Sequence, residues 1–417
     1  MLFSGKPLTA RQQKNTDQNL QEIDAGATVL QSYPRRLVLE LTNACNMNCV
    51  MCGRNAAKFQ PTVFDMDVFH SLEPIMDDIE EVTLMGWGEP TIHPHFKEML
   101  ETIDRHSARK YFCTNGMHLK DLKHTIFDTH VDVFAVSLDG ACAETNDRIR
   151  VGSDFAEITT QLREIEAIKR ANHLKYPWIN FVFCAMKRNL HELPDMVRLA
   201  ADLGIDEVKV VYLTAFSPAL EPEILWGCEP ETADVFAQAA ELAESLGIQM
   251  KLPHLIGQDV AGDQPHKDCF VAWRDFFLGS DGFVRPCMST PVQFFRYDKA
   301  KDFMTMWNDA HYQQYRQTVN DVERMDAPCT RCYQSSHCNW NRKESWLQTG
   351  EDFSPEWERT VASADTERRN KMISTSTRGG ADASLKHTTI RFLAQNLLAS
   401  PDTWRVARRR RRKRSCA

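Results

Sequence analysis

The sequence predicts an α/β protein, with a partial (β/α)6 TIM-like barrel followed by a small cysteine-rich α+β domain. The barrel is predicted because strand-like apolar runs alternate with helical stretches between about residues 33 and 216. Such alternation favours a parallel sheet with right-handed crossovers. The small domain is predicted because five cysteines lie between residues 269 and 338, around a hairpin-like turn.

Six strands are predicted in the barrel, fewer than the eight of a closed TIM barrel. They cover residues 36–41, 81–85, 110–113, 133–137, 178–184 and 207–213. The first range is typical of a β-strand, because Leu37, Leu39 and Leu41 recur at every second residue. Helical patterns lie between the strands, for example over residues 94–106 and 155–171. Because active sites of such barrels lie at the carboxyl ends of the strands, functional residues are sought there.

Four segments are predicted along the chain. Residues 1–33 form an N-terminal lead-in, and residues 34–230 form the barrel. Residues 231–345 form the cysteine-rich domain, and residues 346–417 form a linker with a basic tail. The cysteine-rich domain is expected to begin with an alanine-rich helix over residues 231–246 and a short strand over residues 249–252. The last segment is polar and is predicted to be partly disordered, with a weak amphipathic helix over residues 385–407.

The composition of the 417-residue chain limits the class of protein. Apolar residues make up 42% of the chain, which is enough for a substantial core. No apolar run approaches the length of a membrane span, and the first residues lack the apolar core of a signal peptide. A cytoplasmic location follows as an expectation, and in a reducing compartment the 13 cysteines favour metal ligation over disulfides.

The net charge of −7 is unevenly distributed along the chain. The last 13 residues carry +8, so the preceding 404 residues carry −15. An acidic body argues against a nucleic-acid partner for the main part of the chain. The basic tail is either a solvated run or a contact for acidic lipid or RNA.

Three cysteines directly follow the first predicted strand. Cys45, Cys49 and Cys52 lie within eight residues of one another. Three soft thiolates on one loop suit an iron–sulfur cluster, and a cube of four irons then keeps one iron open for a small molecule. Zinc is the alternative, but structural zinc takes four protein ligands, and this loop offers no fourth Cys or His nearby.

The Cys-x3-Cys-x2-Cys spacing after a strand resembles the signature of the radical SAM superfamily. In that family, the open iron binds the amino and carboxylate groups of S-adenosylmethionine (SAM), and one electron from the cluster cleaves SAM to a 5′-deoxyadenosyl radical. The resemblance implies SAM as a cofactor and a [4Fe-4S] cluster on Cys45, Cys49 and Cys52. It also implies an external one-electron reductant of the flavodoxin or ferredoxin type.

A glycine-rich motif, Gly-Trp-Gly-Glu-Pro at residues 86–90, follows the second predicted strand. It resembles the family segment that holds the methionine ammonium group, through Gly86, Gly88 and Glu89. The usual form is Gly-Gly-Glu-Pro, so Trp87 is a departure. Glycines let a backbone approach a ligand closely, although an ordinary tight turn is the alternative.

Four further SAM contacts are implied by the resemblance. Asn115 lies in a Thr-Asn-Gly turn after the third strand, and Ser137 and Asp139 follow the fourth strand, where the family contacts ribose. Met51 takes the position of a residue that packs on adenine. No catalytic residue is predicted.

For two arginines and four single cysteines, the sequence indicates no specific role. Arg148 and Arg150 either meet the SAM carboxylate or the substrate, or are surface residues. A single cysteine is most often a small buried hydrophobe. That interpretation is applied to the four cysteines scattered outside the two groups, Cys113, Cys142, Cys184 and Cys228.

The second cysteine group is built around a predicted hairpin. Ser-Asp-Gly at residues 280–282 separates two apolar runs and predicts a turn that brings Cys269 and Cys287 together. Cys329 and Cys332 add a close pair. Four cysteines close a metal site without an open position, for which zinc is the alternative to iron–sulfur.

The spacing of this group resembles the auxiliary-cluster extension called SPASM. The full form has seven cysteines and two clusters, whereas this chain has Arg at position 342 and resembles the shortened, single-cluster twitch type. The resemblance implies an auxiliary [4Fe-4S] cluster on Cys269, Cys287, Cys329 and Cys332. Cys338 is a spare thiol or an alternative ligand.

The resemblance covers roughly residues 34–345 and implies a radical SAM enzyme, of oxidoreductase or lyase type, that abstracts hydrogen from a substrate. A small polyhydroxylated metabolite, similar to a sugar or cyclitol, is the predicted substrate, because the N-terminal segment is too short for a peptide-docking domain. A peptide maturase is the alternative. A further alternative is a non-catalytic binding protein in which two metal sites only stabilise the fold. The motif at residues 86–90 disfavours this alternative, because such a protein would not need a SAM pocket.

Overall fold

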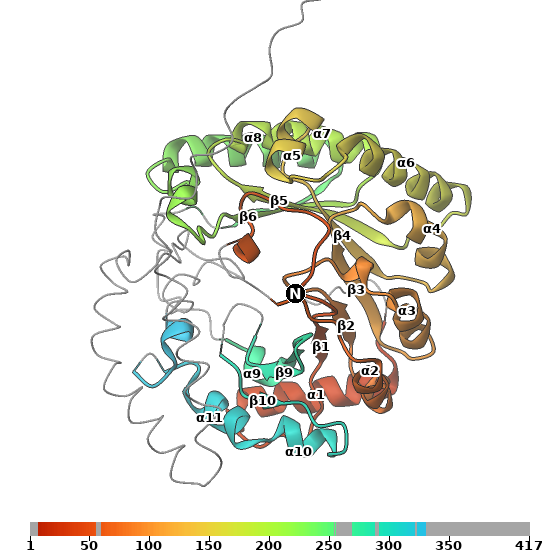
Figure 1. Cartoon of the computed structure of the whole chain (residues 1–417), viewed down its shortest axis with the longest axis vertical. Helices are drawn as coiled ribbons and strands as arrows, with labels where there is room; N and C mark the ends of the chain where they lie inside the picture. The colour runs from red at the N-terminus through yellow and green to blue at the C-terminus, as the bar shows by residue number, and fades with distance from the viewer. Residues whose placement is uncertain are drawn as a thin grey trace, which may run out of the picture. The chain divides into compact units, whose positions relative to one another are not determined.

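Six parallel strands form the centre of the computed structural model, and helices cover their outer face (Figure 1). The structure describes residues 7–55, 60–253, 255, 269–287, 292–321 and 323–330. The six strands are β1 (Arg36–Leu39), β2 (Glu81–Leu84), β3 (Arg109–Thr114), β4 (Val133–Ser137), β5 (Trp178–Ala185) and β6 (Glu207–Tyr212). The helices of this part are α2 (Met66–Ser71), α3 (Phe96–Asp104), α4 (Leu119–Asp128), α5 (Ala143–Ile149), α6 (Phe155–Ala171), α7 (Leu193–Leu203) and α8 (Glu229–Leu246).

The strands belong to one sheet with the order β10-β9-β8-β1-β2-β3-β4-β5-β6-β7. The outer strands are β7 (Gln249–Lys251), β8 (Asp275–Leu278), β9 (Phe283–Arg285) and β10 (Phe295–Arg296). Every neighbouring pair from β8 through β1 to β7 is parallel, and the two pairs at the β10 end are antiparallel. The predicted (β/α)6 barrel and hairpin are confirmed. The hairpin is also joined to the barrel sheet, because β8 pairs with β1.

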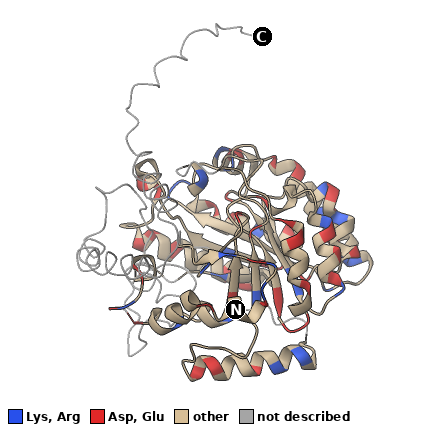
Figure 2. Cartoon of the chain, turned by 60° about the horizontal axis from the view of Figure 1, so that its bottom comes forward, with Lys and Arg blue, Asp and Glu red and all other residues tan. Residues whose placement is uncertain are grey.

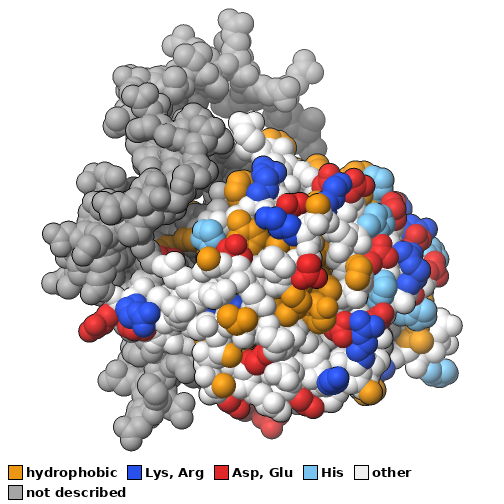
Figure 3. All heavy atoms as spheres, turned by 90° about the horizontal axis from the view of Figure 1, so that it is seen from below, with side chains coloured by type: hydrophobic (Ala, Val, Ile, Leu, Met, Phe, Trp, Pro, Cys, Tyr) orange, Lys and Arg blue, Asp and Glu red, His pale blue; other side chains and the backbone are white. Residues whose placement is uncertain are grey.

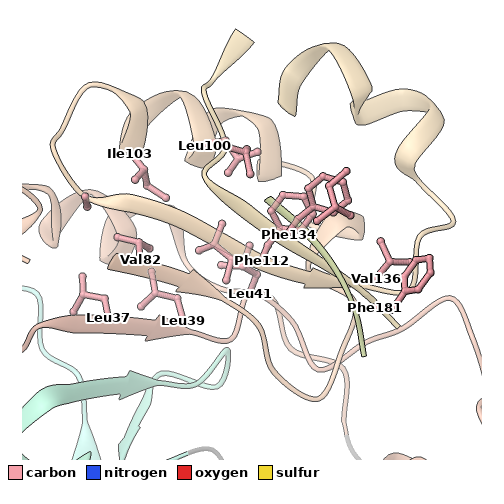
Figure 4. Packing of buried hydrophobic residues seen from close by; sticks show 14 of the residues in the cluster. Leu37, Leu39, Leu41, Val82, Leu100, Ile103, Phe112, Phe134, Val136 and Phe181 are labelled. Atoms are coloured by element: carbon pink, nitrogen blue, oxygen red, sulfur yellow. The ribbon is translucent and has the colours of Figure 1, made fainter. Parts of the chain in front are cut away.

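The hydrophobic core lies between the outer face of the sheet and the helices (Figure 4). Alternate strand residues point to this face, so Leu37 and Leu39 are fully buried there. Phe112 stacks on Phe134 with ring centroids 5.4 Å apart. The intervening residues face the interior of the barrel, where Ser137 lies beside Cys113.

The N-terminal helix α1 (Ala10–Asp24) is bound to the barrel by side-chain amides. Gln12 donates to the carbonyls of Ile79 and Ser107, at 2.7 and 2.9 Å. Asn19 donates to the carbonyl of Trp273 at 2.9 Å. Burial of these polar groups is tolerated because each amide finds a partner. Part of the predicted lead-in is therefore an ordered helix, which contacts the segments just before β2, β3 and β8.

The last described helices pack beside the hairpin. They are α9 (Val271–Arg274), α10 (Phe303–Trp307) and α11 (Ala310–Thr318). Arg316 of α11 is buried and donates to the carbonyls of Ala272, Trp307 and Thr28. One guanidinium thus joins α9, α10 and the segment before β1, which is why a charged side chain can be buried here.

The surface of the described part carries both signs of charge, interspersed over the helices (Figure 2). On the face in Figure 3, hydrophobic side chains occur in small groups between charged ones. Among the described residues, no helix is long and apolar enough to cross a membrane. The predictions for Cys332, Cys338 and the tail lie outside the described residues.

We predict that Phe134→Ala lowers the free energy of unfolding of the iron-free protein by roughly 3–5 kcal/mol, because it removes a stacked, fully buried ring. Urea unfolding followed by circular dichroism measures the loss. Phe134→Leu serves as the control and is expected to cost less. Equal stability of Phe134→Ala and the parent would contradict the packing described here.

Candidate active site

The loop with Cys45, Cys49 and Cys52 leaves the carboxyl end of β1 and is tied to the end of α5. The backbone nitrogen of Asn48 donates to the carbonyl of Val151, and that of Val50 donates to the carbonyl of Ile149, each at 2.8 Å. These bonds give the loop two anchors in an element more than 90 residues away in the chain. The loop that carries the three thiols is therefore held in place by tertiary contacts.

The three thiols influence one another and are half-buried. The pKa of Cys49 is raised to about 11, mainly by burial; Arg150 opposes the rise, and Asp139, Cys52 and Cys45 contribute to it. Arg150 lies with Nη1 at 3.9 Å from the Cys49 sulfur. Burial thus disfavours the thiolate of Cys49 in the metal-free site, and a bound metal would compensate the charge of a thiolate there.

The chemistry of the three thiols fits an iron–sulfur cluster. Among the described residues, no group of three or more Cys, His, Asp or Glu side chains is gathered as around a single metal ion. A cube cluster makes a different demand, because each cysteine binds a different iron. Three soft sulfur donors on one loop are suited to that demand.

The motif at residues 86–90 packs against the start of the cysteine loop. A Cβ atom on Gly86 would lie 2.3 Å from Cγ of Glu40, and one on Gly88 would lie 2.2 Å from the carbonyl oxygen of Ala44. Glycine is therefore required at both positions by the protein itself. The close packing of protein atoms is a reason for these glycines that is separate from the ligand approach predicted from the sequence.

Glu40 was not identified from the sequence as functional, yet it joins three segments at the top of β1. Its side chain is buried and accepts from the backbone nitrogen of Trp87 at 2.9 Å. It also accepts from the hydroxyl of Ser280, in the hairpin turn, at 3.1 Å. Ser280 in turn lies 2.6 Å from the hydroxyl of Thr62. One carboxylate thus fixes the glycine motif and the hairpin turn relative to each other.

Glu89 is buried and accepts four hydrogen bonds. The donors are the backbone nitrogen and hydroxyl of Thr91, the hydroxyl of Thr114 and the backbone nitrogen of Asn115. Burial raises the pKa of Glu89, and these hydrogen bonds oppose the rise. The carboxylate therefore couples the ends of β2 and β3, in addition to the ammonium contact predicted for it.

Asn115, which follows the carboxyl end of β3, lies beside the cysteine loop. Its side-chain nitrogen is 2.7 Å from Oδ1 of Asn46 and 3.8 Å from the sulfur of Cys45. The same residue accepts through Oδ1 from the backbone nitrogen of Met117. The amide is thus oriented by the turn that follows β3.

Asp139 forms a buried ion pair with Arg150, with 2.8 Å between Oδ2 and Nε. Its other oxygen accepts from the backbone nitrogen of Cys184 at 2.7 Å. The side chain of Asp139 is fully buried, so this carboxylate positions the arginine beside Cys49. Of the two arginines left open by the sequence, Arg150 belongs to the site, whereas Arg148 pairs with Glu144 on the exposed face of α5.

The two remaining predicted SAM contacts, Ser137 and Met51, lie in different parts of the barrel. Ser137 faces the barrel interior with its hydroxyl 3.6 Å from the sulfur of Cys113. Met51 packs with Cys184 against a small apolar cluster at the top of β5 and β6. Trp87, the departure from the usual motif, packs edge-on against Phe216 with 5.5 Å between ring centroids. This aromatic pair lies against Gly53, next to Cys52, and only the tertiary structure reveals it.

The second cysteine group gathers around the hydroxyl of Tyr315. Its oxygen lies 3.8 Å from the sulfur of Cys269. Burial and then the neighbouring Cys269, Cys329 and Cys287 raise the pKa of Tyr315 well above its ordinary value. Three of the four cysteines predicted to hold the auxiliary cluster therefore lie near one another, and the fourth, Cys332, is outside the described residues.

Sequence comparison identifies two family domains in the chain. The Radical SAM superfamily matches residues 39–200, and SPASM, an iron-sulfur cluster-binding domain, matches residues 269–333. The chain belongs to the radical SAM superfamily and carries a SPASM domain. It is an enzyme of that class, and its domains imply a [4Fe-4S] cluster with SAM and auxiliary iron–sulfur chemistry.

Several curated relatives are similar in sequence. The tungsten-containing aldehyde ferredoxin oxidoreductase cofactor-modifying protein of Pyrococcus furiosus is 25% identical over 261 residues, which are 60% of this chain and 70% of that protein. The mycofactocin maturase MftC of Mycobacterium tuberculosis is 29% identical over 220 residues, 51% of this chain and 53% of the maturase. The AdoMet-dependent heme synthase of Methanosarcina barkeri is 26% identical over 346 residues, 76% of this chain and 94% of that enzyme. The chain thus spans about half the length of the maturase.

Solved structures share the fold. Streptococcus suis SuiB bound to the precursor peptide SuiA superposes with a TM-score of 0.57 at 15% identity, covering 74% of this chain and 71% of SuiB. The enzyme anSMEcpe with bound AdoMet superposes with a TM-score of 0.52 at 11% identity, covering 82% of this chain and 99% of that one. At these identities the likeness shows the fold alone.

We predict that Glu40→Ala weakens SAM binding about tenfold, because buried donors on Trp87 and Ser280 lose their acceptor, at about 1–3 kcal/mol. Isothermal titration calorimetry with the iron-loaded protein measures the dissociation constant. Thr62→Val is the matched control, since Thr62 contacts Ser280 without contacting Glu40. Unchanged SAM affinity in a folded Glu40→Ala variant would show that the link does not position the SAM segment.

We predict that Asp139→Asn lowers the free energy of unfolding by about 3–5 kcal/mol, because Arg150 is left buried without its counter-charge. Denaturant unfolding of the iron-free protein measures the loss. Ser137→Ala is the control and is expected to change stability much less. If Asp139→Asn altered SAM affinity and left stability intact, a direct ribose contact would explain Asp139 better than the ion pair.

Proposed function

We propose that this enzyme is a radical SAM maturase that acts on a peptide substrate. The observation that carries the proposal is the match to mycofactocin maturase, at 29% identity over 220 residues. The sugar- or cyclitol-like substrate predicted from the sequence finds no support among the relatives, and the peptide alternative fits them better. The substrate prediction was weak because it rested on the length of the N-terminal segment.

In this proposal, Cys45, Cys49 and Cys52 hold the [4Fe-4S] cluster, which with SAM supplies the radical that abstracts hydrogen. Glu40 and Glu89 hold the SAM segment in place, through Trp87 and through Thr114 and Asn115 respectively. Reduction of the cluster requires an external one-electron donor of the flavodoxin or ferredoxin type. The chain's own contribution is positioning and exclusion of water, as for other cofactor enzymes.

The aromatic pair of Trp87 and Phe216 supports the exclusion of water. Both rings are half-buried and lie against Gly53, beside Cys52. A Cβ atom on Gly53 would lie 2.7 Å from Trp87, so the loop and the ring fit closely. Apolar rings next to the cysteine loop limit solvent access, which protects a radical from side reactions.

A second candidate is a step in heme synthesis. The match to the AdoMet-dependent heme synthase covers 94% of that enzyme, a larger share than the match to the maturase covers. The peptide maturase and the heme synthase differ in substrate, and both would use the same SAM chemistry. A single assay with both classes of substrate therefore separates them.

We predict that the anaerobically reconstituted protein, reduced with dithionite, cleaves SAM to 5′-deoxyadenosine faster when a cognate precursor peptide is present. The assay scores 5′-deoxyadenosine and the mass of each candidate peptide, with heme precursors in a parallel arm. A Cys45→Ala, Cys49→Ala, Cys52→Ala variant is the control and should produce none. Turnover of the heme precursor alone would replace the peptide proposal with the second candidate.

A further inference from the structure

We propose that Tyr315 tunes the auxiliary iron–sulfur cluster, by donating a hydrogen bond to the thiolate of Cys269 and thereby raising the reduction potential of the cluster. The inference rests on Cys269 as a cluster ligand and is independent of the substrate. It concerns a residue outside the sequence motifs, since no pattern in the sequence distinguishes Tyr315 from the other aromatic residues of α11.

The geometry defines which atom donates. The hydroxyl oxygen of Tyr315 lies 3.8 Å from the sulfur of Cys269, within the range of hydrogen bonds to sulfur. Either atom could donate if both carried a proton. A cysteine that binds iron does so as a thiolate and has no proton, so the tyrosine must be the donor.

The donor is held in place by the packing of α11. Tyr315 is buried, and its ring lies against Phe294 with 5.6 Å between centroids. The phenol of a tyrosine ordinarily carries its proton at neutral pH, so the hydroxyl is available as a donor. A fixed, protonated hydroxyl in a buried site makes a stronger hydrogen bond than one in water.

The acceptor is fixed from the same side of the fold. The backbone nitrogen of Cys269 donates to Oδ1 of Asn320 at 2.7 Å, and the side chain of Asn320 donates back to the carbonyl of Cys269 at 3.4 Å. Asn320 follows α11 directly, so one helix and its end hold both partners. The distance between the hydroxyl of Tyr315 and the sulfur of Cys269 is therefore set by contacts to the same helix and its end. A chance contact would not have such support on both sides.

The consequence for the cluster follows from electrostatics. A reduced cluster carries one more negative charge than an oxidised one, and hydrogen bonds to its sulfurs stabilise that charge. The hydroxyl of Tyr315 therefore stabilises the reduced state more than the oxidised state. The auxiliary cluster becomes a better electron acceptor than it would be with an apolar residue at position 315.

The test uses the full chain with Cys45, Cys49 and Cys52 replaced by Ala, so that only the auxiliary cluster contributes to the spectrum. In this background, redox titration followed by electron paramagnetic resonance compares Tyr315→Phe with Tyr297→Phe. Tyr297 is the matched control, because its hydroxyl contacts Ser71 at 3.1 Å. We expect the reduction potential to fall in Tyr315→Phe and to stay unchanged in Tyr297→Phe, with equal iron content.

An unchanged potential in an iron-loaded Tyr315→Phe variant would overturn the proposal. Full iron content in Cys269→Ala would also overturn it, because the premise of ligation would fail. If Tyr315→Phe does not retain its cluster, 3-fluorotyrosine placed at position 315 keeps the ring and makes the phenol a stronger donor. A positive shift of the potential is then expected, and no shift would contradict the proposal.

Discussion

The buried carboxylate of Glu40 is the contact on which the arrangement of the site depends. It lies just past the carboxyl end of β1 and accepts from Trp87 of the glycine motif and Ser280 of the hairpin turn. Gly86 has no side chain, and the space is filled by Glu40 itself. A buried carboxylate is stable only with such donors, so Glu40 and its partners must be assembled together.

The parallel sheet explains why these partners meet. Because β8 and β2 flank β1 and run parallel to it, their carboxyl ends lie at the same edge of the sheet. The cysteine loop, the glycine motif and the hairpin turn leave from those ends. The SAM half and the SPASM half of the chain are thus joined by strand pairing, and the hairpin is an extension of the barrel sheet.

Buried polar contacts within the protein occur at several positions that are also predicted to contact SAM. Asp139 neutralises Arg150, which in turn lies next to the sulfur of Cys49. Glu89 bridges the ends of β2 and β3 through Thr114 and Asn115. A motif residue that faces a cofactor can therefore also be the residue that shapes the site.

The sequence by itself determined the six strands, the hairpin and the two cysteine groups, because alternation of apolar residues and cysteine spacing are local patterns. It also placed the motif at residues 86–90 at a strand end. Only the tertiary structure decided the partners of Glu40, the pairing of Asp139 with Arg150 and the position of Tyr315 beside Cys269. These contacts join residues from 11 to 240 positions apart, and their formation depends on strand order and packing, which no local pattern encodes.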